Sequence, residues 1–129
     1  MAEESLKSRI LNADDIPVEV IEVPEWDDIK IEIRGMNGKE RAGFLRRTTA
    51  DGGEVSFEKF YPELLIATVF DPETGEKVFA PADRDNINTK SGAALERVAT
   101  VAQRHSGLGA TDVEEAVGKS EGQEKNAST

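Results

Sequence analysis

The sequence predicts an α+β fold, in which a small antiparallel β-hairpin or sheet packs with three to four helices between flexible termini. Residues 16–23 are rich in β-branched side chains, and residues 29–34 alternate strictly between apolar and charged ones, as two strands of a hairpin do. Apolar side chains then recur at helical spacing in residues 57–68 and 90–106. A chain of 129 residues is long enough for one domain with a modest core.

The chain divides into four predicted segments. The first is polar apart from Leu6, Ile10 and Leu11, and it predicts a short frayed helix or a disordered arm. The last contains no apolar residue larger than alanine, which predicts disorder. The segments are an N-terminal arm (1–15), a globular α+β domain (16–110), a short C-terminal helix (111–119) and a disordered tail (120–129).

The second predicted strand has one apolar face. Isoleucines occupy every second position of residues 29–34, and charged residues occupy the positions between them. This alternation is typical of a strand with one side buried. Pro17 indicates either that the first strand begins there or that this strand lies at a sheet edge. Two strands alone are marginally stable, so helices or a third strand must cover the isoleucine face.

Asn37 is predicted to begin a helix. Its side chain can accept a hydrogen bond from the first turn, and Glu40 stands three residues later, as in a capping box. Residues 51–53 (DGG) then end the helical pattern. The predicted apolar side of this helix consists of Ala42, Phe44 and Leu45.

The next helical pattern is interrupted by a proline. Its apolar stripe contains Phe57, Phe60, Tyr61, Leu64, Leu65 and Thr68. A proline inside a helix removes a backbone hydrogen bond, so we expect the regular helix to begin at Pro62 as its first residue. Residues 64–70 also have the β-branched content of a strand, and of the two alternatives we favour the helix.

A turn and a capped helix follow. Residues 71–75 (DPETG) place proline second and glycine last, as a tight turn requires, and a short extended segment comes after them. Residues 81–88 predict a polar connector or a single helical turn. Residues 90–106 predict the clearest helix, with Gly107 as its C-terminal cap and Leu108 folding back on the last turn.

The composition argues against several function classes. A net charge of −10 disfavours binding to a nucleic-acid backbone, because phosphate contacts need clustered Lys and Arg. The chain contains no cysteine, which removes disulfides and thiolate metal sites. No apolar run approaches the roughly 20 residues that span a bilayer, and residues 1–7 do not form a signal peptide. We therefore expect no membrane partner and a cytoplasmic location.

No catalytic, metal or cofactor site is predicted. His105 is the only histidine, and its position near a helix C-terminus suits a cation that interacts with the helix dipole. A calcium-loop pattern that starts at Asp83 fails, because Asn88 and Ala94 stand where glycine and glutamate are needed. The paired carboxylates lie in polar stretches with nothing to raise their pKa. We expect a protein that is not an enzyme.

Five segments in a particular order point to a function. They are residues 20–26 (VIEVPEW), 37–44 (NGKERAGF), 64–71 (LLIATVFD), 78–79 (VF) and 90–108, which begins KSGAALERV. In this order and pattern the chain resembles the tail assembly chaperone family of bacteriophages with long non-contractile tails, including phages of actinobacteria. The likeness extends over residues 17–118 and includes no catalytic signature.

The resemblance implies a role in virion morphogenesis. Members of the family bind the long helical tape measure protein, keep it soluble and help to recruit tail tube subunits. They leave the assembled tail, so the resemblance implies a protein of the host cell cytoplasm that is absent from the mature virion. Self-association is a further expectation, because many copies are needed to coat a long partner.

The family also makes a longer product by programmed ribosomal frameshifting. A disordered C-terminal tail suits such an extension. Residues 124–126 (EKN) and 118–119 (GK) are compatible with slippery codon sequences. The nucleotide sequence near the stop codon decides whether a slippery heptamer exists.

Aromatic side chains are the predicted partner contacts. They are Trp26, Phe44, Phe60 and Tyr61. Trp26 is the only tryptophan and lies in a Pro-Glu-Trp-Asp loop, where it can anchor a partner or cover the hairpin as part of the core. Both interpretations of Trp26 stay open.

Two other classes are compatible with the sequence. A structural head–tail or tail completion protein would remain in the virion, where mass spectrometry would detect it. An acidic inhibitor or adaptor of a host enzyme would need its carboxylates along one elongated face. Lys and Arg are interspersed through both main helices, which disfavours the second class.

Overall fold

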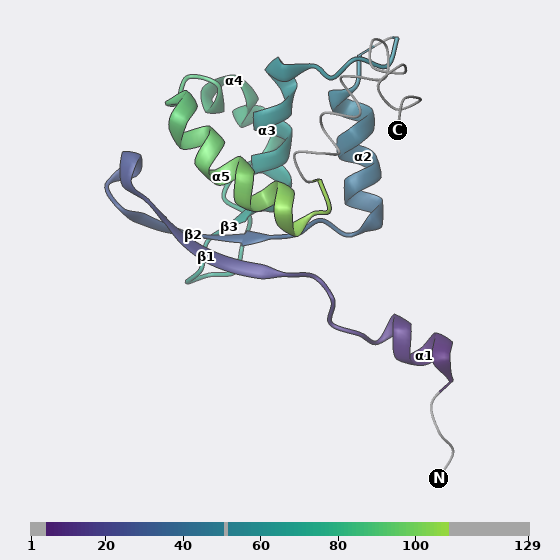
Figure 1. Ribbon diagram of the computed structural model, residues 1–129. Helices are drawn as coiled ribbons and strands as arrows, with labels where there is room; N and C mark the ends of the chain where they lie inside the picture. The colour runs from purple at the N-terminus through teal and green to yellow at the C-terminus, as the bar shows by residue number, and fades with distance from the viewer. Residues whose placement is uncertain (1–4, 51, 109–129) are drawn as a thin grey trace, which may run out of the picture.

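A three-stranded antiparallel sheet carries helices on one of its faces (Figure 1). The computed structural model describes residues 5–50 and 52–108. The predicted α+β fold is confirmed: helices cover the isoleucine face, and a third strand extends the hairpin at its edge. The elements are α1 (Leu6–Leu11), β1 (Val18–Val23), the 3-10 turn η1 (Pro24–Trp26), β2 (Ile29–Arg34), α2 (Gly38–Thr48), α3 (Phe57–Thr68), β3 (Val69–Phe70), the 3-10 turn η2 (Pro81–Asp83), α4 (Arg84–Ile87) and α5 (Gly92–His105).

The predicted hairpin is confirmed, with β2 in the centre of the sheet. β1 pairs with β2 from Val18 opposite Arg34 to Val23 opposite Ile29, and β3 pairs with the other side of β2. Along β2 the alternation places two of the three isoleucines in the core. Ile29 is 53% exposed, because it lies at the end of the hairpin that extends past the helices (Figure 1).

The capping box of α2 is formed as predicted. The Asn37 side chain accepts a hydrogen bond from the Glu40 amide at 2.9 Å, and the Glu40 carboxylate accepts one from the Asn37 amide at 2.9 Å. The apolar side of this helix is narrower than expected. Phe44 is buried, whereas Ala42 and Leu45 are exposed.

The prediction that the regular helix begins at Pro62 is wrong, because α3 begins at Phe57 and continues through the proline. Pro62 has no N–H to donate to the carbonyl group of Glu58, four residues earlier. The side-chain amide of Asn88 donates to that carbonyl oxygen at 2.8 Å and replaces the missing bond. The helix favoured for residues 64–70 is correct up to Thr68, and the last two residues form β3.

The C-terminal cap of α5 is the one the sequence predicts. Gly107 has a φ of 72°, and the Leu108 amide donates to the Gln103 carbonyl at 2.8 Å. At the other end Ser91, which was not predicted as a cap, accepts a hydrogen bond from the Ala94 backbone amide at 3.2 Å. The end of α5 lies directly against the chain after β2. A Cβ atom on Gly35 would come within 2.0 Å of the His105 carbonyl oxygen, so only glycine allows this approach.

The core lies between the sheet and helices α3 and α5. Its fully buried members come from the sheet, α3 and α5. They include Val23, Ile33, Leu64, Leu65, Val69, Val98 and Ala102. Among the described residues, no buried side-chain nitrogen or oxygen atom lacks a hydrogen-bond partner. Every buried polar side-chain atom of the described residues therefore has a hydrogen-bond partner, as is usual in a protein core.

The N-terminal segment stands apart from this core. Helix α1 contributes no buried residue, and in Figure 1 it lies away from the sheet and the other helices.

Residues 81–88, predicted as a connector or one helical turn, form η2 and α4. The predicted helix at 111–119, the tail at 120–129 and the frameshift-compatible residues lie outside the described residues.

Candidate protein-interaction site

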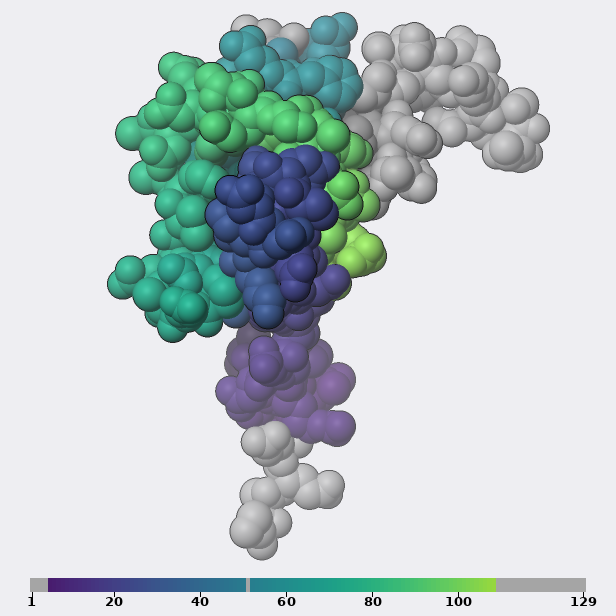
Figure 2. All heavy atoms as spheres, turned by 90° about the vertical axis from the view of Figure 1, so that its left-hand side faces the viewer, coloured from purple at the N-terminus to yellow at the C-terminus, as the bar shows by residue number. Residues whose placement is uncertain are grey.

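An open groove lies beside Trp26, with a volume of about 470 Å³. Its walls come from segments far apart in the sequence: the hairpin end, α3, the segment that follows the 71–75 turn, η2, α4 and the start of α5. Figure 2 shows the hairpin end, in dark blue, in front of the green surface of α5. The lining residues are Trp26, Leu65, Val78, Phe79, Asp83, Asn86, Ile87, Lys90 and Leu95.

Trp26 is positioned by an ion pair next to it. The Glu25 carboxylate accepts two hydrogen bonds from the Arg97 guanidinium of α5, both at 3.0 Å. This two-point contact fixes the hairpin end against α5, and the hydrogen bonds from Arg97 lower the pKa of Glu25. Trp26, the next residue, is half-buried: it packs against the core and also lines the groove.

The opposite wall depends on the turn after β3. The predicted tight turn at 71–75 is confirmed, with a hydrogen bond from the Gly75 amide to the Asp71 carbonyl at 2.7 Å. The chain then runs back along β3, where the Val78 amide donates to the Val69 carbonyl at 3.2 Å. This return places Val78 and Phe79 at the groove, and Val78 is 45% exposed there.

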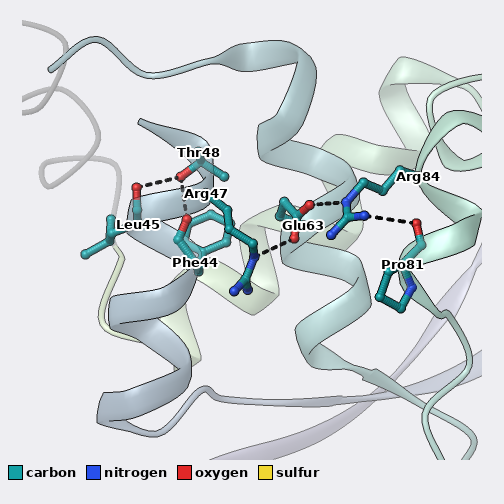
Figure 3. Close-up of polar contacts among 7 residues, drawn as sticks. All are labelled: Phe44, Leu45, Arg47, Thr48, Glu63, Pro81 and Arg84. Carbon is teal, nitrogen blue, oxygen red and sulfur yellow. Dashed lines mark hydrogen bonds and ion pairs between the residues drawn. The ribbon is translucent and has the colours of Figure 1, made fainter. Parts of the chain in front are cut away.

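A buried carboxylate holds the far side of α3. Glu63 is 3% exposed and accepts hydrogen bonds from Arg47 of α2, at 2.8 Å, and from Arg84 of α4 (Figure 3). Burial raises the pKa of Glu63, but the hydrogen bonds from Arg84 and Arg47 outweigh it, so its pKa is lower than usual. Arg84 also donates to the Pro81 carbonyl at 3.2 Å. The network joins α2, α3 and the segment that forms one groove wall.

The four aromatic residues predicted as partner contacts occupy different environments. Phe44 is 1% and Phe60 8% exposed, and their rings form an edge-to-face pair with centroids 5.5 Å apart. Their burial gives these two side chains a packing role in the core. Tyr61 and Trp26 are half-buried, and partner binding by them stays a prediction. Of the four, Trp26 alone lines the groove.

Tyr61 takes part in a polar contact with α5. Its hydroxyl donates to the Glu96 carboxylate at 2.7 Å, and this hydrogen bond raises the pKa of Tyr61 to about 12. The contact orients the tyrosine along the surface between α3 and α5. Its ring packs edge-to-face against Phe60, with centroids 5.8 Å apart, and does not line the groove.

Sequence reasoning missed most of the groove. Val78 and Phe79 were expected only as an extended segment, and Lys90 and Leu95 only as parts of a helix. Glu63 was also missed, although a single acidic residue between Pro62 and Leu64 in an apolar stripe is a signal for a buried ion pair.

His105 lies at the end of α5, as predicted, and has a specific partner. Its Nε2 atom is 2.7 Å from Oε1 of Glu19 on β1, and Arg104 donates to the same oxygen at 3.0 Å. The hydrogen bonds with His105 and Arg104 lower the pKa of Glu19. Among residues 5–50 and 52–108, no group of three or more His, Asp or Glu side chains is placed to hold a metal ion.

Within the residues that the structure describes, no helix is long and apolar enough to cross a bilayer.

Comparison with solved structures identifies the fold class as one found in a phage assembly protein. The chain superposes on the structure of the bacteriophage HK97 tail assembly chaperone with a TM-score of 0.53. The two share 16% sequence identity, over 75% of this chain and 89% of that chain. No protein-family model and no curated protein sequence matches the chain. The similarity at this identity is one of fold.

Proposed function

We propose that this chain is a bacteriophage tail assembly chaperone, which binds the tape measure protein, keeps it soluble and helps to recruit tail tube subunits. The observation that carries this proposal is the fold shared with the HK97 tail assembly chaperone over 89% of that chain. The order of sequence segments supports the same role independently of the coordinates. The role is one of binding without catalysis.

The groove beside Trp26 is the proposed contact for the tape measure protein. Its apolar side chains come from five separate segments, and Asp83 and Lys90 stand among them as charged groups. A groove of this kind suits the apolar face of an amphipathic helix, with polar groups fixing its orientation. Tryptophan and phenylalanine at the walls supply the large contact areas typical of binding hot spots.

The charge of the chain supports the solubilising part of the role. At −10, each bound copy adds negative charge to a partner whose apolar face it covers. Repulsion between such complexes opposes aggregation. We place this activity in the host cell cytoplasm, before the tail is complete, and expect the chain to be absent from the mature virion.

The test is co-expression with the long helical protein encoded near this chain in its genome. We expect the partner to be soluble and to co-purify only when this chain is present, and we expect mass spectrometry of purified virions to lack this chain. A partner that stays insoluble, together with stoichiometric presence of the chain in virions, would favour a structural tail completion protein instead.

A longer frameshifted product belongs to the same proposal. Sequencing of the coding region near residues 118–126 tests it, because a slippery heptamer must precede the stop codon. Absence of any such heptamer would remove the frameshift from the proposed function and leave the binding role unchanged.

A further inference from the structure

Positive charge is concentrated in one part of this acidic chain. Two hollows of about 460 Å³ each lie beside α2, and both are lined by Arg46 and Arg47. Their walls include six of the 14 Lys and Arg residues in the described part of the chain, but only two of its 18 Asp and Glu residues. These six cations form the basic surface: Lys39, Arg46, Arg47, Lys59, Lys77 and Arg84.

The two acidic residues in these walls are already engaged. Glu63 is shared by Arg47 and Arg84, so one carboxylate faces two guanidinium groups (Figure 3). The Glu40 carboxylate accepts the capping hydrogen bond from the Asn37 amide. The basic surface therefore retains an excess of positive charge on a chain whose net charge is −10.

Four members of the basic surface stand without a carboxylate partner in the described part of the chain. Among residues 5–50 and 52–108 no ion pair includes Lys39, Arg46, Lys59 or Lys77, and all four side chains are exposed. The fold brings the basic surface together from α2, α3, the segment after the 71–75 turn and α4. The concentration of charge is thus a product of tertiary structure and not of one basic run in the sequence.

Gly43 makes room for two of the guanidinium groups. It lies in the middle of α2, where glycine is less favourable than alanine. A Cβ atom at this position would lie 2.9 Å from Nη1 of Arg47 and 3.7 Å from Nη2 of Arg46. The ends of both side chains therefore converge above the glycine, at the hollow that Lys39 and Lys77 also line.

Arg47 is held in this position from its other side. Its Nε atom donates to the buried Glu63 carboxylate at 2.8 Å, while its Nη1 atom lies over Gly43. The guanidinium group is oriented before any ligand arrives, which reduces the conformational entropy lost on binding. The planar fork of a guanidinium matches a carboxylate, which accepts two parallel hydrogen bonds from it.

The arrangement favours an acidic peptide over a nucleic acid. A nucleic-acid backbone carries its charge past the two hollows in both directions, where it would meet the acidic remainder of the chain. A short acidic peptide can place its carboxylates within the basic surface alone, where the charges are complementary.

We propose that the basic surface binds an acidic peptide segment of another protein, with carboxylates at Arg46 and Arg47 above Gly43 and at Lys59 and Lys77 on either side. The surface lies on the side of α3 that carries Glu63 and shares no lining residue with the groove beside Trp26. This second interaction surface goes beyond the proposed function and does not depend on it. One copy can hold an apolar helix in the groove and an acidic segment on the basic surface at the same time.

Two full-length variants of equal net charge test the basic surface. Arg46→Glu with Lys59→Glu reverses two of its members, and Lys7→Glu with Lys30→Glu reverses two lysines elsewhere. All four side chains are exposed and lie outside the ion pairs of the described residues. Both variants should therefore be folded by circular dichroism.

The probe is a fluorescent eight-residue peptide of glutamate, and its anisotropy reports binding at low salt. We expect the natural chain and the Lys7, Lys30 control to bind it, and the Arg46, Lys59 variant to bind about tenfold more weakly, because attraction becomes repulsion. A matched peptide of glutamine should not bind. No binding of the glutamate peptide by the natural chain, or equal losses in the two variants, would overturn the proposal.

Gly43→Ala tests the place where the guanidinium groups converge. The added methyl group displaces the end of the flexible Arg47 side chain, so we expect a folded chain with a reduced affinity for the glutamate peptide. An affinity equal to that of the natural chain would contradict the location of the site above Gly43.

Two further results would assign the surface to another ligand. An eight-nucleotide oligothymidylate that binds more tightly than the glutamate peptide would indicate a nucleic-acid site. Neutralisation of four carboxylates near the C-terminus tests the chain's own acidic segment, by Glu114→Gln, Glu115→Gln, Glu121→Gln and Glu124→Gln. Its charge-matched control is Asp14→Asn, Asp15→Asn, Asp27→Asn and Asp28→Asn.

We expect the two neutralised variants to bind the glutamate peptide equally. Tighter binding by the C-terminal variant than by its control would show that the chain's own segment, and not another protein, occupies the basic surface. Peptide binding by a chain that does not bind the helical partner would leave this proposal standing and remove the proposed function. Partner binding by a chain that ignores the peptide would do the reverse.

Discussion

The two sides of helix α3 differ in whether their side chains have partners within the chain. On one side Glu63 is buried and paired with two arginines (Figure 3). On the other side Leu65 lies at the base of an open groove whose walls are largely apolar. The comparison separates stability from the proposed binding. The polar side joins α2, α3 and α4 through Glu63, and the apolar side lines the groove that the proposed function assigns to a partner.

The largest effect is expected from removal of the two arginines that pair with Glu63. Arg47→Ala combined with Arg84→Ala leaves the Glu63 carboxylate buried without a counter-charge, which costs about 3 kcal/mol of unfolding free energy. Urea unfolding measures this loss, with Arg46→Ala, an exposed residue of the same helix, as the control. A loss no larger than that of the control would show that the network does not hold the helices together.

The pH dependence of stability sharpens the same side. The pKa of Glu63 in the folded chain lies below its usual 4.5, so the unfolded chain binds the proton more readily. The stabilisation is therefore complete above about pH 4.5 and is lost as the pH falls through the folded-state pKa. The unfolding free energies of the natural chain and of Glu63→Gln should become similar as the pH falls through the folded-state pKa. Parallel pH profiles would contradict the assignment.

The hydrogen bond that replaces the one lost at Pro62 gives a smaller effect. Asn88→Ala should cost about 1 kcal/mol of unfolding free energy, because the Glu58 carbonyl loses its donor. In a Pro62→Ala background the helix can supply its own N–H, so the cost of Asn88→Ala should fall. Equal costs in the two backgrounds, measured by a double-mutant cycle, would show that the two residues are not coupled.

The groove side should give the smallest effect on stability. Val78→Asp changes an exposed side chain, so we expect the unfolding free energy to change by less than about 0.5 kcal/mol. The same substitution should abolish binding of the helical partner, because it places an unpaired charge in an apolar contact. A large loss of stability would show that Val78 belongs to the core.

Features that depend on neighbouring residues were predicted correctly from the sequence. The capping box at Asn37, the turn that ends at Gly75 and the C-terminal cap at Gly107 each depend on residues within a few positions of one another. Strict alternation in residues 29–34 gave the strand and its buried face in the same way. Local chemistry determines these elements, so one sequence is enough to find them.

Features that depend on distant residues were missed. The continuation of α3 through Pro62 depends on Asn88, which lies 30 residues beyond the carbonyl group it satisfies. Burial of Phe44 and Phe60 depends on how α2 meets α3, and the groove assembles only when the 71–75 turn returns the chain beside β3. Of the four aromatic candidates Trp26 alone lines the groove, and partner binding by the four stays a prediction.

The most direct measurement compares the yield of co-purified tape measure protein for variants on the two sides of α3. At a temperature where all are folded, we expect the Arg47→Ala, Arg84→Ala variant to retain its partner as the natural chain does. Val78→Asp should lose the partner. Retention of the partner by Val78→Asp, or no binding even by the natural chain, would contradict the account of this protein as a chaperone that acts through the groove.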